Sequence, residues 1–106
     1  MANYVLIYSG GGMPATEAER AAAMQAWGNW FGKLGAAVVD AGNPFAQAAK
    51  SIAGDGRVSE APVGTPATGY SILKADSLDA AVALAKDCPV LREGAQISVY
   101  ETFPVM

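Results

Sequence analysis

The sequence predicts a single α+β domain, with two helices on one face of a mainly antiparallel sheet. Strand-like and helix-like segments alternate along the chain, and only two segments have helical periodicity. The length of 106 residues is close to the commonest size of one domain, so we treat residues 1–106 as a single domain. A doubly wound parallel sheet would need more helices, because parallel strands are usually joined by helical crossovers.

The first two predicted elements are a strand and a long helix. Tyr4 to Tyr8 is aromatic and β-branched and is followed by glycines, which is typical of a strand that ends in a loop. Thr16 and Glu19 have capping-box spacing, so a helix should begin there, run to Leu34 and end at Gly35. Its apolar residues recur three and four positions apart and form one stripe: Ala23, Met24, Trp27, Trp30, Phe31 and Leu34.

The middle of the chain is predicted to contain strands and loops. Ala36 to Asp40 should form a strand that turns at residues 41–44. Phe45 to Val58 has two interpretations: its alanines favour a helix, whereas Gly54-Asp55-Gly56 suits the turn of a hairpin, and we favour the hairpin. Prolines and glycines predict a loop over Ala61 to Ala67.

The last third of the chain repeats the strand, helix, strand pattern. Thr68 to Ala75 is a predicted strand, and Asp76-Ser77 should cap a second helix that ends before Pro89. Ala95 to Phe103 is the final predicted strand. With the hairpin set aside, the order of elements is the βαββαβ order of a ferredoxin-like fold.

The first strand is apolar on both faces, which bears on assembly. Val5 and Ile7 share one face, and Tyr4, Leu6 and Tyr8 share the other. A sheet with one face in water should instead alternate apolar and polar residues. Only 16% of the residues are charged, which leaves few charges to cover the surface of a monomer. We therefore expect a homodimer in which helices cover one sheet face and a second subunit covers the other.

Composition argues against several classes of partner and site. The net charge is −3 and the seven basic residues are scattered, so we expect neither nucleic acid nor a membrane surface as a partner. No secretory leader or spanning segment is evident and Cys88 is the only cysteine, which predicts a cytoplasmic protein. The chain has no histidine, so we expect no metal and no cofactor.

Several segments together resemble the YCII-related family, also called the DGPF-domain family, of the dimeric α/β-barrel superfamily. The resemblance implies a ferredoxin-like fold, sheet-to-sheet dimers and a cleft between sheet and helices. Some family members carry a histidine on the first helix, suspected of acid–base chemistry with an aspartate; the corresponding position here is near Met24, so that pair is absent. The segments that carry the resemblance are Asn3–Tyr8, the helix end before Gly35, Ala41–Phe45, Gly69–Ala81, Cys88-Pro89 and Ile97–Glu101.

The candidate site residues are expected to line this cleft. The ligand-binding candidates are Tyr8, Met24, Trp27, Asn43 and Tyr70. A tryptophan on an apolar helix stripe is also explained by core packing, so Trp27 has a structural alternative.

Two carboxylates are candidates for a catalytic role. Asp40 ends a strand, and Glu101 shares strand parity with Ile97 and Val99, which face the helices. If both lined one cleft they could act as base and polar anchor; otherwise Asp40 caps its turn and Glu101 lies in water past the helices.

The sequence is compatible with two functions. The first is binding of a small organic molecule in the cleft, with a cofactor-free enzyme as one form of it. The alternative is a non-catalytic module for dimerisation or interaction. A cleft filled by Trp27 and Trp30 would favour the module.

Overall fold

The computed structural model describes residues 1–11 and 15–105 and has a four-stranded sheet at its centre. All neighbouring strands of this sheet are antiparallel, in the order β2-β5-β1-β6. The strands are β1 (Ala2–Gly10), β2 (Val38–Asp40), β5 (Ala67–Ala75) and β6 (Ala95–Glu101).

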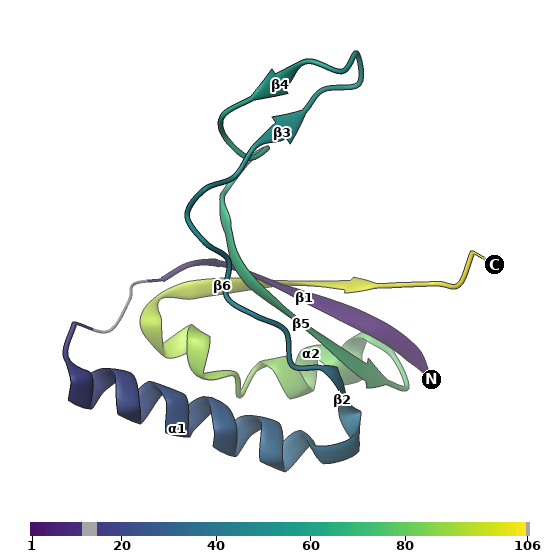
Figure 1. The fold of residues 1–106 in the computed structure, drawn as a ribbon. Helices are drawn as coiled ribbons and strands as arrows, with labels where there is room; N and C mark the ends of the chain where they lie inside the picture. The colour runs from purple at the N-terminus through teal and green to yellow at the C-terminus, as the bar shows by residue number, and fades with distance from the viewer. Residues whose placement is uncertain (12–14, 106) are drawn as a thin grey trace.

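Two helices lie on the same face of the sheet (Figure 1). They are α1 (Glu17–Leu34) and α2 (Leu78–Ala85), and each is followed by a short 3-10 helix, η1 (Gly35–Ala37) and η2 (Pro89–Glu93). The predicted α+β class is confirmed, and the strand order is compatible with a ferredoxin-like fold. Neither helix in the described part of the chain has the length and apolar character needed to cross a membrane.

Both helices begin at the residues that the sequence predicts. Thr16 Oγ1 accepts a hydrogen bond from the Glu19 N–H at 3.1 Å, and Glu19 Oε2 accepts one from the Ala15 N–H at 3.1 Å. In α2, Ser77 Oγ accepts from the Ala80 N–H at 3.1 Å. These bonds satisfy N–H groups that have no partner inside the helix.

The core lies between the sheet and the helices. Tyr4, Leu6 and Tyr8 alternate along β1 and are buried, and Leu73 lies beside them on β5. The helices and the segment after them complete this core with Trp30, Ala81, Ala85, Cys88 and Val90. Cys88 packs in this interior and is only 2% exposed, as is common for a free cysteine.

Neither helix of the described residues lies on the opposite sheet face (Figure 1). Val5, Ile7 and Ile72 lie on this open face and are half-buried, and Tyr100 is 60% exposed. The register pairs Val5 with both Ile72 and Tyr100, so these apolar side chains are neighbours across three strands.

A two-stranded hairpin projects from the body of the molecule, and we call residues 46–66 the arm (Figure 1). Its strands are β3 (Ser51–Ile52) and β4 (Val58–Ser59), which confirms the predicted hairpin. In its turn, Asp55 Oδ1 accepts from the Arg57 N–H at 2.9 Å. Oppositely charged side chains also pair along the arm, Lys50 with Glu60 and Arg57 with Asp55.

Two predicted strands are shorter than expected. The first half of the expected strand over residues 36–40 is the 3-10 turn η1, because Gly35 has a φ of +54° and redirects the chain as α1 ends. The final strand ends at Glu101 instead of Phe103, because the register places Glu101 opposite Tyr4 and β1 itself begins at Ala2. Phe103 is therefore 78% exposed.

Candidate ligand-binding cleft

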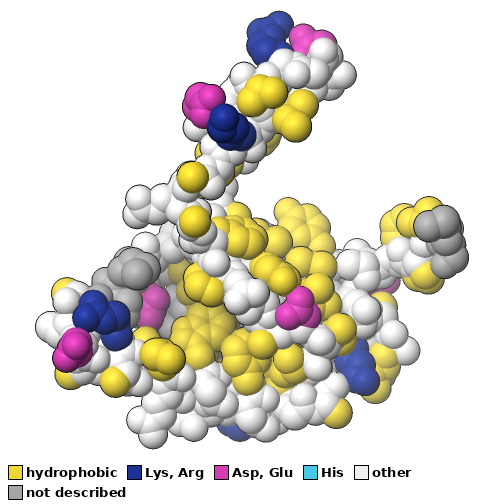
Figure 2. Space-filling model, viewed as in Figure 1, with side chains coloured by type: hydrophobic (Ala, Val, Ile, Leu, Met, Phe, Trp, Pro, Cys, Tyr) yellow, Lys and Arg dark blue, Asp and Glu magenta, His cyan; other side chains and the backbone are white. Residues whose placement is uncertain are grey.

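A cavity of about 610 Å³ lies between α1 and the helix-facing side of the sheet. One wall comes from α1, and the other comes from the strands and from the loop that follows β2. Hydrophobic side chains gather below the base of the arm in Figure 2. The residues around the cavity are Tyr8, Gly10, Gly11, Arg20, Ala23, Met24, Trp27, Phe31, Ala41–Pro44, Thr68–Ser71, Val90 and Glu93.

The cleft exists because α1 is anchored at few points. Trp30 is the only buried residue of α1, and its indole N–H donates to the Leu84 carbonyl oxygen at 3.2 Å. On the sheet side, Gly69 has no side chain; a Cβ there would lie 3.2 Å from the Asn43 carbonyl oxygen and 3.4 Å from the Tyr8 ring. Helix α1 is thus joined to α2 at Trp30, whereas the cavity lies between α1 and the sheet beside Gly69.

Aromatic rings form much of the α1 wall. The Trp27 ring meets the Tyr8 ring edge-to-face, with 5.4 Å between centroids, and meets the Phe31 ring at 5.8 Å. Trp30 lies behind Trp27, with 5.8 Å between their centroids. Edge-to-face contacts of this kind hold rings in defined orientations. The two tryptophans therefore build the wall and do not fill the cavity.

A chain of hydrogen bonds crosses the floor of the cleft. The Tyr8 hydroxyl donates to Ser71 Oγ at 2.7 Å, and the Ser71 hydroxyl donates to the Ala41 carbonyl oxygen at 2.7 Å. Burial raises the pKa of the Tyr8 phenol well above its ordinary value of 10.0. Tyr8 therefore stays protonated at neutral pH and is no general base.

The loop after β2 is held close to β5. Gly42 has a φ of +78°, and a Cβ at this position would overlap the Tyr70 carbonyl oxygen. The Gly42 N–H donates to Asp40 Oδ1 at 2.9 Å, which closes the turn. Only glycine combines this backbone conformation with this close approach.

The structure brings all five ligand-binding candidates to this cleft: Tyr8, Met24, Trp27, Asn43 and Tyr70. Tyr70 differs from the other four candidates in the direction of its side chain. Its side chain has the strand parity of Ile72 on the open face, its ring stacks on Phe45 and its hydroxyl donates to Asp40 Oδ2 at 3.0 Å.

The two carboxylate candidates do not line the cleft. Asp40 accepts hydrogen bonds from Gly42 and Tyr70, which is the turn-capping alternative. Glu101 is exposed and accepts from the Tyr4 hydroxyl at 3.2 Å, near the end of β1 remote from Tyr8. The condition for a shared role, one cleft with both carboxylates, is therefore not met.

Sequence reasoning missed two charged residues of the cleft, Arg20 and Glu93. Arg20 could have been found, because it precedes Ala23 by three positions and Trp27 by seven and so continues the apolar stripe. Glu93 ends η2, and no periodicity in the sequence relates it to α1.

Burial also raises the pKa of the Cys88 thiol behind this wall, so the thiol stays protonated at neutral pH.

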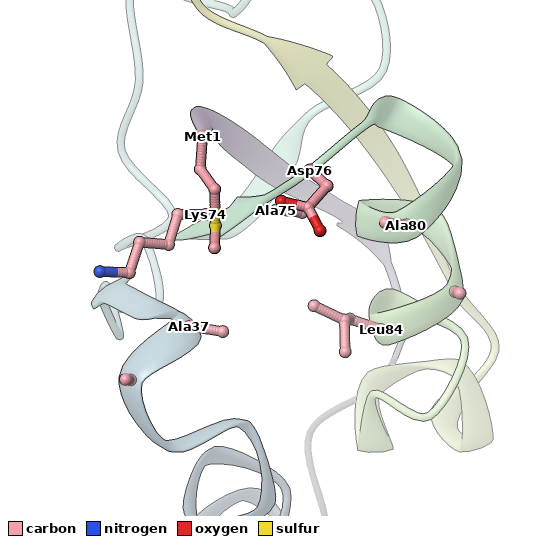
Figure 3. A pocket seen from close by; sticks show the side chains of 9 residues that line it. Met1, Ala37, Lys74, Ala75, Asp76, Ala80 and Leu84 are labelled. Carbon is pink, nitrogen blue, oxygen red and sulfur yellow. The ribbon is translucent and has the colours of Figure 1, made fainter.

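A second, smaller cavity of about 380 Å³ lies at the other end of the helix layer. Figure 3 shows Ala37 and Leu84 on opposite sides of it, with Lys74 and Asp76 on the strand side. The described residues that line it include no aromatic side chain. The larger cleft is therefore the better candidate for a site.

No group of three or more metal-ligating side chains occurs among residues 1–11 and 15–105. In comparisons with known proteins, no family model matches the chain, and no curated protein or solved structure is detectably similar to it.

Proposed function

We propose that this chain binds a small, mainly apolar organic molecule in the cleft between α1 and the sheet. The observation that carries the proposal is a cavity of about 610 Å³ with an aromatic wall and few polar groups. Ligand sites commonly have volumes of about 300–1,000 Å³ and this kind of lining. The resemblance to the YCII-related family, which implies a cleft in this position, agrees with the proposal.

Binding without catalysis is the form of this function that the side chains favour. The chain has no histidine, and burial keeps both the Tyr8 phenol and the Cys88 thiol protonated at neutral pH. Asp40 and Glu101, the carboxylates considered for catalysis, lie outside the cleft. A positioned base with a matched pKa is the usual requirement for proton transfer. Among the described lining residues the one carboxylate is Glu93, so the cleft holds no pair of carboxylates for such chemistry.

The proposal can be tested with N-phenyl-1-naphthylamine, a neutral dye that fluoresces on entering an apolar site. We expect the dye to bind, and we expect Ala23→Phe to weaken the signal strongly, because Ala23 lines the cavity and a ring at this position would occupy space between α1 and the sheet. Ala22→Phe is the matched control, since Ala22 is exposed on the same helix outside the lining. Equal dye binding by both variants would show that the dye occupies another surface.

We also propose that the chain forms a homodimer through the open sheet face, as in a dimeric α/β barrel. The specific observation is the row of apolar neighbours Val5, Ile72 and Tyr100 on the sheet face opposite both described helices. Large exposed apolar patches on monomers commonly mark interfaces. Such pairing is compatible with the cleft, because the cleft lies on the opposite side of the sheet.

Light scattering coupled to chromatography tests the dimer. We expect a mass of two chains for the unmodified protein and of one chain for Ile7→Asp, which places a charge in the proposed interface. Gln25→Asp, on the exposed part of α1, is the control and should remain dimeric. A single-chain mass for the unmodified protein at micromolar concentration would overturn this proposal.

A further inference from the structure

We infer that the ligand of the cleft is a monocarboxylate with an elongated apolar body, whose carboxylate binds Arg20. The inference rests on the proposed function and narrows it to one chemical class. It is carried by the position of a single cation at the end of the aromatic wall.

The residues of α1 that line the cleft define the shape of this ligand. Arg20, Trp27 and Phe31 all line the cavity, and they lie seven and eleven residues apart along the same helix. A rise of 1.5 Å per residue places Trp27 about 10 Å and Phe31 about 16 Å from Arg20 along the axis. A molecule lying along α1 can therefore keep its apolar part against the rings while its head group reaches Arg20.

The chemistry of Arg20 selects the head group. A guanidinium presents a planar set of donors that matches the two oxygens of a carboxylate. Within the described part of the chain, the ion pairs join Lys50 with Glu60 and Arg57 with Asp55, and none includes Arg20. The guanidinium is therefore available to a ligand.

Glu93 limits the charge of the ligand. It lines the same cavity from η2 and would repel a second negative charge near Arg20. A ligand with one carboxylate is attracted by Arg20 and is repelled by Glu93 less than a ligand with two carboxylates would be. A cationic ligand would instead pair with Glu93 and be repelled by Arg20, so the sign of the preferred charge tests which residue dominates.

The experiment is calorimetric titration at pH 7 with three probes of equal length: 6-phenylhexanoate, 6-phenylhexan-1-ol and 6-phenylhexylamine. We expect the acid to bind roughly tenfold more tightly than the alcohol, the gain typical of a hydrogen bond to a charged group. Arg20→Gln should remove this difference, because it weakens acid binding much more than alcohol binding. Lys33→Gln is the matched control, because it removes one positive charge from the same helix outside the cleft.

Each other outcome contradicts a different statement. Equal affinity for acid and alcohol, or an acid preference that survives Arg20→Gln, would overturn the carboxylate inference and leave the proposed function intact. Preference for the amine would assign the head-group site to Glu93 and also overturn it. Failure of all three probes to bind would count against the proposed function itself. Circular dichroism of each variant establishes that it is folded.

Discussion

The two helices cover the same face of the sheet but are attached to it differently. Helix α2 has eight residues, and its alanines Ala81 and Ala85 are buried against the strands. Helix α1 has eighteen residues, and Trp30 alone is buried. Because the size of the side chains at a contact sets the distance between packed elements, alanines allow close packing whereas large rings keep α1 away from the sheet. The short helix therefore closes the core, and the long helix forms one side of a cleft.

The largest effect should come from removing the anchor of α1. Trp30→Ala is expected to lower the free energy of unfolding by about 3–5 kcal/mol, the usual range for a buried tryptophan. Trp27→Ala should lower it by only about 1 kcal/mol, because Trp27 is half-buried and borders the cavity. Urea denaturation of both variants measures the difference. Similar losses would mean that α1 is anchored along its whole length and that the contrast between the helices is false.

A smaller effect tests the close packing of α2. Ala81 is completely buried, so Ala81→Leu should overpack the contact with the sheet and lower the free energy of unfolding by about 1–3 kcal/mol. Ala22→Leu, at an exposed position of α1, should change it by less than about 0.5 kcal/mol. If Ala81→Leu were harmless in thermal denaturation, α2 would have the freedom that we assign to α1.

The caps of the two helices should also respond differently to mutation. Ser77→Ala and Thr16→Ala each remove one capping hydrogen bond, with an expected local loss of about 1 kcal/mol. In α2 this loss should reduce global stability, since the helix is part of the core. In α1 it should mainly increase hydrogen exchange of the first turn, because the nearest buried residue is Trp30. Equal exchange behaviour of the two variants would contradict this expectation.

The smallest effect at neutral pH, and a measurable one in alkali, concerns Tyr8. Burial raises the pKa of the Tyr8 phenol in the folded protein, so the folded chain holds the phenol proton more tightly than the unfolded chain does. The associated stability is fully present below the unfolded pKa of about 10 and is lost as pH rises beyond it. Thermal melting between pH 8 and 11 should show this decline, and Tyr8→Phe should make it shallower. An unchanged slope would show that Tyr8 ionises freely in the folded protein.

The sequence predicted the elements better than the site, for a physical reason. Capping at Thr16, the stop at Gly35 and the hairpin at Gly54-Asp55-Gly56 are local signals, and the structure confirms all three. The cleft depends on contacts between distant segments. The approach of Gly42 to Tyr70 is one such contact, because it depends on how two segments pack and not on their own periodicity.

The charged residues show the same limit. Strand parity correctly placed Glu101 on the same face as Ile97 and Val99. The burial of Glu101 depends on where the helix layer ends, and strand parity gives no information about that position. Arg20 continues the helical spacing of the apolar stripe and could have been predicted from it, but it is a charged residue among apolar ones and was not chosen. Glu93 could not have been predicted in this way, because it lies in a 3-10 segment outside any periodic element.

The projecting arm affects how the size of this protein should be measured. The radius of gyration is 15.2 Å, whereas a compact chain of this length would have about 13 Å. Friction in solution depends on such extension, so a single chain should migrate in gel filtration like a larger compact protein. Elution volume alone could then mimic self-association, and the subunit number has to come from a method that reports mass independently of shape.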